Sequence, residues 1–346
     1  MKGCGIFMLG VATATILVLQ TMGSRSIRRF VCSSCISNIR SLQQAPVTKP
    51  GQVSANHPRR ATRVHTSNKT LVIIMGSIRG GEHTWHSMYR NLLDLNHADL
   101  ALAVGYDDNK NSSLYIRTNY LWEFEEYKDW GEALDLIASQ DDATYSKYAN
   151  TSWRAVLVDA MPDILGGYGK IMGSGAIIFW IRWFISNKLR ELNLLERYDR
   201  FIVTRSDHYY LCEHNLTGLD PTKVWVPEGQ TWGGITDRHV VAPSEKILQV
   251  LNITPPLLRN PIEYLKVLAE LDINLKSINP ERLIRHRWNM QGIKYEKFRR
   301  MMFTCAVPGD KTRWKEGDPN NRGPQGVMPK YFGEYKLSNR TCGLLE

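Results

Sequence analysis

The sequence predicts an α/β protein in which a mixed, mainly parallel sheet is flanked by helices. Two short apolar runs, at 70–75 and 99–105, are separated by a segment whose apolar residues recur at helical spacing. A strand, helix and strand of these lengths form a βαβ unit. A third apolar run, at 198–207, is bounded by polar residues, which is typical of a central strand in a parallel sheet.

Several segments carry the periodicity or composition of one type of structure. In chain order these are strands at 70–75 and 99–105 with a helix at 84–95 between them, a short strand at 155–158, a loop at 166–169, a helix at 175–195, and strands at 198–207 and 223–227. The chain between the second strand and residue 155 shows no sustained periodicity and receives no assignment. Beyond Cys305 the chain is rich in Gly, Pro and Lys, and we expect an irregular tail.

Composition divides the chain into three parts. Residues 1–22 include an 18-residue stretch without charge, barely enough to span a bilayer, so we expect a retained signal anchor, with a cleaved signal peptide as the alternative. Residues 23–69 are rich in Ser, Gln, Pro and Arg and are expected to form a flexible basic stem. Residues 70–346 are expected to form the folded domain.

The net charge of +10 lies almost entirely in the anchor and stem. Residues 23–70 hold nine Lys or Arg and no acid, and Lys2 supplies the tenth excess charge. The remaining 34 basic residues balance 34 acidic ones in residues 71–346. A neutral folded part argues against nucleic acid as a partner.

Six Asn-x-Ser/Thr triplets favour the lumen of the secretory pathway, where such asparagines accept glycans. They begin at Asn68, Asn111, Asn150, Asn215, Asn252 and Asn339. We therefore expect a single-pass type II protein of the Golgi or ER membrane, with a secreted protein as the alternative. The arginines that directly follow the apolar segment oppose this orientation, because positive charge favours the cytoplasmic side.

Five of the six cysteines bear on disulfide bonding. Cys32 and Cys35 lie in the stem and are candidates for a linker disulfide, a disulfide-linked dimer or lipidation rather than for zinc. The folded part holds Cys212, Cys305 and Cys342. At most one disulfide is expected among these three, which leaves one free thiol or a thiol paired elsewhere.

Polar and glycine residues follow the first, second and third predicted strands. Arg79 and Gly80 lie in the turn after residues 70–75, where glycine lets the backbone approach a phosphate, although a plain strand-to-helix turn is the alternative. Asp107 follows the second strand and is a candidate for contact with a ribose. Arg205 and Asp207 end the third strand, where ligands gather in parallel sheets; a salt bridge at a strand end is the alternative.

A second informative segment spans 232–241. Trp232 offers a flat apolar face for a sugar ring, Gly233 and Gly234 allow a substrate to lie against the backbone, and Asp237 adds a carboxylate. The structural alternative makes the two glycines a bulge and pairs Asp237 with Arg238.

In order and content, these pieces resemble the nucleotide-sugar-dependent glycosyltransferases of the GT-A fold. The resemblance rests on the strand of the expected Rossmann-like sheet that ends in Arg205-Ser206-Asp207, and on the segment 233–238, Gly-Gly-Ile-Thr-Asp-Arg. In that family an Asp-x-Asp, often degraded to Arg-x-Asp, holds a divalent cation on the donor diphosphate. The resemblance implies that Asp207 holds the cation, expected to be Mn²⁺, and that a late histidine, His286, is a further metal ligand. Arg205 departs from the pattern, because a guanidinium pairs with phosphate but cannot ligate a metal.

The site residues receive roles from the chemistry of sugar transfer. Arg79, Gly80, Asp107, Arg205 and Asp207 are expected to bind the donor, whose leaving diphosphate gains negative charge. Asp237 is the candidate general base for the acceptor hydroxyl. Trp232, Gly233 and Gly234 are expected to contact the acceptor.

We therefore expect a hexosyltransferase-like enzyme that moves a sugar from a nucleotide-sugar donor to a glycan or glycoprotein acceptor. The membrane is an expected partner through the N-terminal segment. The alternative from another class is a catalytically inactive lumenal glycan-binding protein with the same fold.

Overall fold

The computed structural model describes residues 69–107, 110–139, 153–158, 160–161, 174–271, 278–308, 310, 320 and 322–344. The predicted anchor at 1–22, the stem up to residue 68 and the predicted loop at 166–169 lie outside the described residues. No helix among the described residues is both long and apolar enough to cross a membrane.

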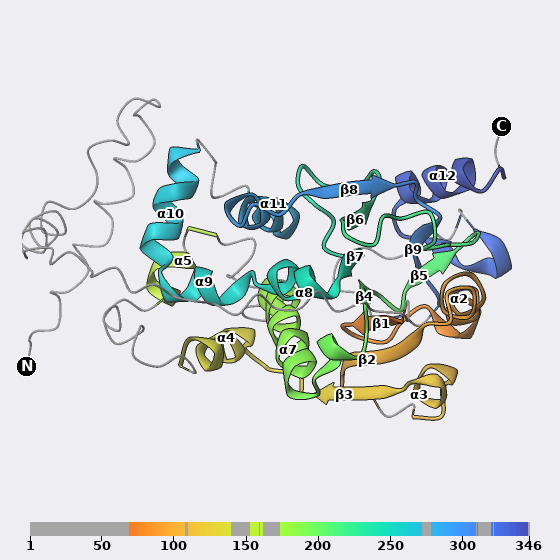
Figure 1. Ribbon diagram of the computed structural model, residues 1–346, viewed down its shortest axis with the longest axis horizontal. Helices are drawn as coiled ribbons and strands as arrows, with labels where there is room; N and C mark the ends of the chain where they lie inside the picture. The colour runs from red at the N-terminus through yellow and green to blue at the C-terminus, as the bar shows by residue number, and fades with distance from the viewer. Residues whose placement is uncertain are drawn as a thin grey trace, which may run out of the picture. The chain divides into compact units, whose positions relative to one another are not determined.

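A seven-stranded sheet with the order β3-β2-β1-β4-β7-β6-β8 forms the centre of the described domain (Figure 1). Its strands are β1 (Thr70–Met75), β2 (Asp99–Gly105), β3 (Tyr120–Phe124), β4 (Arg200–Thr204), β6 (Val224–Pro227), β7 (Val240–Pro243) and β8 (Tyr295–Phe298). The strands from β3 to β4 are parallel, β7 is antiparallel to both its neighbours, and β6 is parallel to β8. The predicted mixed, mainly parallel sheet is confirmed.

The direction of winding reverses between β1 and β4. From β1 the chain adds β2 and then β3 on one side, and it returns to place β4 on the other side of β1. The two strands run in register, with Ile74 opposite Thr204, so their carboxyl ends lie side by side. In open α/β sheets, ligands bind at the carboxyl ends of the strands at such a reversal.

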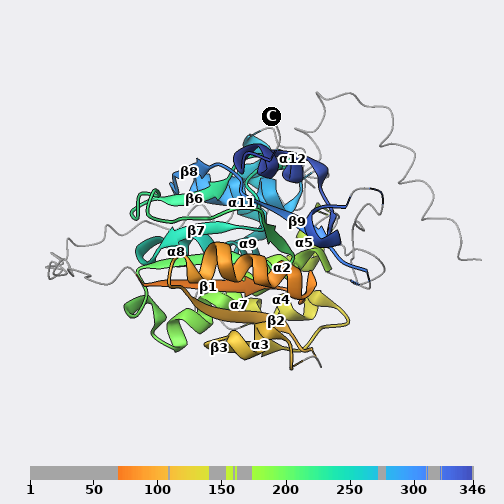
Figure 2. The ribbon, with the colours of Figure 1, turned by 90° about the vertical axis from the view of Figure 1, so that its right-hand side faces the viewer.

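Successive residues of a strand point to opposite faces of the sheet. Here both faces carry apolar side chains, and helices cover both of them. Leu71 and Ile73 pack into one core cluster, and Val72 and Ile74 into another. Figure 2 shows α2 lying over the face that is turned to the viewer. This face is covered by α2 (Gly81–Met88), the π-helix η2 (Tyr89–Asp94) and α3 (Ser113–Arg117). The core cluster on the opposite face includes residues of α4 (Trp130–Ser139), α7 (Ile177–Glu191), α8 (Ser244–Leu251), α9 (Thr254–Arg259), α10 (Pro261–Glu270) and α11 (Pro280–Met290), and α10 packs on α9 rather than on the sheet.

The C-terminal segment is folded, so the expectation of an irregular tail beyond Cys305 is wrong. A second sheet has the order β10-β9-β5, and a final helix packs beside β9 (Figure 1). These elements are β5 (His208–Tyr210), β9 (Met302–Ala306), β10 (Met328–Pro329) and α12 (Phe332–Thr341). A disulfide joins Cys212 to Cys342, while Cys305 is buried and free, as the count of cysteines predicted.

Three other expectations need correction. Residues 155–158 lie mostly in a helix, α5 (Trp153–Leu157), rather than a strand, because Trp153 and Arg154 donate hydrogen bonds to Asp135 of α4. The unassigned stretch contains β3 and α4, which are held by a cluster of aromatic rings that no local periodicity reveals. The predicted helix at 175–195 is α7, flanked by the 3₁₀ turns η3 (Ser174–Ala176) and η4 (Leu194–Glu196).

Candidate active site

A cavity of about 380 Å³ opens at the carboxyl ends of β1 and β4. Five parts of the chain form most of its wall. They are Gly76, Ser77 and Arg79 after β1, Arg205 after β4, Trp232, Asp237 and Arg238 in the loop before β7, Glu281 at the start of α11, and Lys330 and Tyr331 before α12. Four predicted site residues, Arg79, Arg205, Trp232 and Asp237, therefore lie in one cavity. Its volume lies in the range of small-ligand sites.

The turn after β1 is fastened to the residues after β4. The backbone N–H of Arg79 donates to the hydroxyl of Ser206 at 2.9 Å. Gly80 has a φ of +91°, and a Cβ atom there would lie 3.1 Å from the Cα of Asp207. The N–H of Gly80 donates to the carboxylate of Asp310 at 3.3 Å. Gly80 thus brings two strand ends together and does not line the cavity itself.

Arg205 and Asp207 form a two-pronged ion pair. The Nε of Arg205 donates to Oδ1 of Asp207 at 2.7 Å and its Nη2 donates to Oδ2 at 2.6 Å. Asp207 is only 1% exposed, whereas Arg205 reaches the cavity. Burial opposes the charge of Asp207, but the charge and hydrogen bonds of Arg205 outweigh it, so the pKa of Asp207 lies below its ordinary value. The strand-end ion pair considered as an alternative for these residues is present.

The predicted metal ligands do not fit a divalent cation in this arrangement. Both carboxylate oxygens of Asp207 accept hydrogen bonds from Arg205, and a cation ligand must offer oxygen lone pairs to open space. His286 is buried on α11 and does not line the cavity. Within the described part of the chain, no group of three or more His, Cys, Asp or Glu side chains could hold a metal ion.

Of two basic side chains that sequence reasoning did not select, Lys330 lines the cavity and Arg182 lies behind its wall. Lys330 is 2% exposed, and no described carboxylate lies within ion-pair distance of its ammonium group. Burial lowers its pKa to about 8; the charge of Asp207 opposes this shift, and the charges of Arg205 and Arg79 add to it. Behind the wall, the buried Arg182 of α7 donates from Nη2 to the carbonyl oxygen of Asp237 at 3.0 Å.

The Asp237 carboxylate lies at the cavity with little support from hydrogen bonds. Its Oδ1 is buried and accepts no hydrogen bond from any described residue, and its nearest charged partner is the Nε of Arg238 at 3.5 Å. Arg238 is held in turn by Glu334 of α12 at 2.9 Å and by the hydroxyl of Thr304 at 3.1 Å. The predicted pairing of Asp237 with Arg238 is present, and both residues line the cavity.

Glu281 is a site residue that sequence reasoning missed. Burial, and next the charge of Asp237, raise its pKa to about 8, so this carboxyl group keeps its proton at neutral pH. It follows Asn279 and Pro280, a helix-start signal, and the side chain of Asn279 caps α11 by accepting from the N–H of Arg282. The cap predicts where α11 begins but gives no sign that this helix start faces Asp237.

Gly233 and Gly234 bring Glu281 to the site rather than contacting a substrate. A Cβ atom on Gly234 would overlap the carbonyl group of Glu281, and one on Gly233 would lie 2.9 Å from the Nε of Arg282. Neither glycine lines the cavity. The loop instead packs closely on α11, where the N–H of Ile235 donates to the carbonyl oxygen of Glu281 at 3.0 Å.

Two aromatic rings form the outer wall of the cavity. Trp232 is 45% exposed, and its ring lies 5.6 Å from that of Tyr331 in an edge-on contact. Its φ of +49° is uncommon for a residue with a bulky side chain. An exposed indole beside a cavity that holds charged side chains suits contact with a sugar ring. Asp107 follows β2, one strand further from the reversal, and does not line the cavity.

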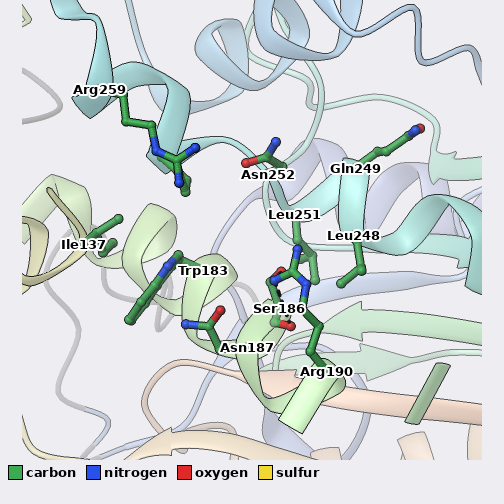
Figure 3. Close-up of a pocket in the computed structure, with 11 residues that line it drawn as sticks. Ile137, Trp183, Ser186, Asn187, Arg190, Leu248, Gln249, Leu251, Asn252 and Arg259 are labelled. Carbon is green, nitrogen blue, oxygen red and sulfur yellow. Dashed lines mark hydrogen bonds between the residues drawn. The ribbon is translucent and has the colours of Figure 1, made fainter. Parts of the chain in front are cut away.

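A second cavity, of about 470 Å³, lies between α7, α8 and α9 (Figure 3). Arg190, Asn252 and Arg259 face it, with Trp183 and Ile137 at one side. The Nη1 of Arg190 donates to the hydroxyl of Ser186 on the same helix at 2.8 Å. No carboxylate lines this cavity, and it contains no residue selected from the sequence. The acid and base groups lie at the sheet reversal.

Comparison with known proteins adds little to this geometry. No family model matches the chain, and no curated protein matches its sequence. Among solved structures, it is similar to mouse xyloside xylosyltransferase 1 in its apo form, at 9% sequence identity and a TM-score of 0.36. The match covers 66% of this chain and 84% of that chain. Similarity at this level carries no argument about activity, so the function must be argued from the site.

Proposed function

We propose that this protein is a glycosyltransferase that moves a sugar from a nucleotide-sugar donor to a hydroxyl group of a glycan or glycoprotein. One observation carries the proposal. The cavity at the sheet reversal is lined by the cationic Arg79, Arg205 and Lys330 and by the carboxyl groups of Asp237 and Glu281, together with Arg238 and Glu126. The order of sequence motifs, which resembles GT-A glycosyltransferases, supports the same function.

The cationic side chains suit the leaving group of such a reaction. Breaking the bond between sugar and phosphate builds negative charge on the diphosphate, and cations already in place stabilise that charge most strongly where water is excluded. Lys330 is almost completely buried, so its charge acts in a medium of low polarity. Arg205 adds guanidinium N–H donors whose orientation is fixed by Asp207.

The carboxyl groups of Asp237 and Glu281 suit the acceptor side of the reaction. Asp237 is the proposed general base, because it lines the cavity and its buried Oδ1 accepts no hydrogen bond within the described protein. Glu281 holds a proton at neutral pH and donates a hydrogen bond to a sugar hydroxyl. Trp232 supports the apolar face of a sugar ring.

We place the domain in the secretory pathway. The Cys212–Cys342 disulfide supports an oxidising compartment. Asn111 and Asn215 are exposed and suited to carry glycans, Asn252 is half-buried, and Asn339, at 5% exposure, is not suited. The membrane anchor at 1–22 and the type II orientation are part of this proposal.

The test is a screen of the full chain with UDP-sugars and GDP-sugars, with and without manganese, for binding by calorimetry and for release of the nucleotide. Hydrolysis or transfer with any donor supports the enzyme. Binding of glycans without turnover of any donor would favour the second candidate, an inactive lumenal glycan-binding protein. The closed Arg205–Asp207 pair is the observation that favours this second candidate, because it occupies the carboxylate expected to serve the donor.

A further inference from the structure

We infer that the cavity binds a diphosphate directly through Arg205, Lys330 and Arg79, without a bridging divalent cation. The inference deepens the proposed function, on which it rests for the identity of the ligand as a nucleotide diphosphate. The binding of an inorganic diphosphate tests these three side chains without reference to the nucleotide sugar.

A guanidinium group lies where a metal ion would be expected. Asp207 ends the strand beside the reversal, but the guanidinium of Arg205 lies against both of its oxygens. The fork of Arg205 uses two of its five N–H donors for this pair, and Arg205 lines the cavity. The cationic group that faces a ligand at this strand end is therefore a guanidinium group.

The Arg205–Asp207 pair contributes hydrogen-bond donors but no excess charge, so excess positive charge beside it must come from another side chain. Lys330 supplies that excess: it lines the cavity, is 2% exposed, and has no carboxylate within ion-pair distance in the described part of the chain. Lys330 lies between β10 and α12, and its backbone N–H donates to the backbone carbonyl oxygen of Thr304 at 2.9 Å. A buried cation with no carboxylate at ion-pair distance is stabilised when an anion joins it.

Hydrogen bonds hold the turn that carries Arg79. Arg79 is held beside Arg205 by the hydrogen bond from its N–H to Ser206, and its carbonyl oxygen accepts from the indole of Trp85 at 2.8 Å. The charged groups that act on Lys330 are Asp207 and Asp310, which favour its charged form, and Arg205 and Arg79, which oppose it. A diphosphate bound by Arg79, Arg205 and Lys330 would offset the repulsion between their positive charges.

The direct test is an isothermal calorimetric titration of the full chain with inorganic pyrophosphate in buffer that contains EDTA. We expect binding in EDTA that magnesium does not strengthen. Lys330→Gln should weaken binding about tenfold or more, because it removes a charge-assisted contact. Lys223→Gln is the matched control: Lys223 is an exposed lysine paired with Glu296 at the sheet edge, and its loss should leave binding unchanged.

A second variant addresses the fork without leaving a buried charge alone. Arg205→Gln combined with Asp207→Asn replaces the ion pair by two neutral amides, and it should also weaken pyrophosphate binding about tenfold. Thermal unfolding of each variant confirms that the fold is retained. If a variant does not fold, the wild-type protein gives an independent result. The pKa of Lys330 should rise on binding, so near pH 8 the wild-type protein should take up more protons, or release fewer, on binding pyrophosphate than Lys330→Gln does, measured by calorimetry in buffers of different ionisation enthalpy.

The outcomes separate the inference from the proposed function. Pyrophosphate binding that requires magnesium or manganese, binding that is unchanged in Lys330→Gln, or no binding in any condition would overturn the inference. Donor turnover that depends on manganese, without pyrophosphate binding in EDTA, would refute the inference and keep the transferase. Pyrophosphate binding in EDTA with no turnover of any nucleotide sugar would do the reverse.

Discussion

The Nη1 of Arg238 lies 2.9 Å from the carboxylate of Glu334, and both side chains are buried. The same carboxylate lies 3.3 Å from the Nη1 of Arg300 and accepts the N–H of Thr304 at 2.7 Å. One glutamate of the last helix therefore holds two arginines, and one of them lines the cavity. The C-terminal segment is part of the site rather than an appendage.

Replacing Glu334 by Gln should destabilise the fold. The change removes the counter-charge of Arg300 and leaves Arg238, among the described residues, only Asp237, at 3.5 Å. Breaking a buried pair in this way costs about 3–5 kcal/mol. Urea unfolding of the purified protein measures the loss. Glu296→Gln, at the exposed pair with Lys223, should show no measurable change. Equal stability of Glu334→Gln and the wild type would show that this ion-pair network does not hold the segment.

Gly234→Ala should disturb both folding and activity. The added methyl group would overlap the carbonyl group of Glu281, so α11 or the loop must move. Overpacking of this kind costs about 1–3 kcal/mol, and it also displaces Glu281 from Asp237. Gly218→Ala is the matched control, because a Cβ atom there meets nothing within 4 Å. Melting temperature and donor hydrolysis report the two effects, and a fully active Gly234→Ala protein would contradict the packing role.

Asp237→Asn should reduce turnover without reducing donor affinity. The amide keeps the shape of the side chain but cannot take a proton, so kcat should fall by about 10²–10⁴-fold. Steady-state kinetics and calorimetry with the donor found by the screen measure the two quantities separately. Asp220→Asn, in an exposed turn, serves as the control. Unchanged kcat would remove Asp237 from the mechanism.

Glu281 should impose a pH dependence on stability. Its pKa is raised from 4.5 to about 8 in the folded protein, so the folded state keeps a proton that the unfolded chain releases. Its stabilising contribution is present below pH 4.5 and is lost as the pH rises toward about 8. In Glu281→Gln, the free energy of unfolding should therefore depend less on pH across this window. Urea titrations at several pH values test this, and an unchanged slope would argue against a raised pKa.

His214 should act in the opposite direction. It stacks on Phe298 with ring centres 4.6 Å apart, and burial, followed by the charge of Arg200, lowers its pKa from 6.5 to about 3. The unfolded chain binds a proton below pH 6.5 that the folded state refuses, so stability falls as the pH falls from 6.5 toward 3. His214→Phe should reduce this acid sensitivity by up to about 1.4 kcal/mol per pH unit. The same acid unfolding curve for both proteins would contradict this prediction.

The parts of the fold that the sequence predicted well are those with local signals. The strand at 70–75 matches β1 and the strand at 99–105 matches β2 residue for residue, because both are uninterrupted apolar runs in the buried centre of the sheet. The rule that ligands gather at strand ends selected Arg79 and Arg205, which the sheet reversal brings to one cavity. Helix α5 was missed because its structure depends on contacts with α4, which is distant in the sequence.

The parts of the site that escaped prediction come from long-range contacts. Lys330 lies in a stretch whose composition is typical of a surface tail, and only the pairing of β10 with β9 carries it to Arg205. Glu281 carries no motif, and its raised pKa arises from burial beside Asp237. Gly233 and Gly234 were recognised as close-approach residues, but the group that approaches them is α11.

The covalent link between Cys212 and Cys342 ties the end of α12 to the residues after β5. Helix α12 carries Glu334, and Glu334 pairs with Arg238 at the cavity. Reduction of the disulfide should therefore loosen α12 and, with it, the position of Arg238 at the proposed reaction centre. Protein made in a reducing bacterial cytoplasm would lack this fastening, so preparations from oxidising hosts are the ones in which the catalytic groups should stand as described.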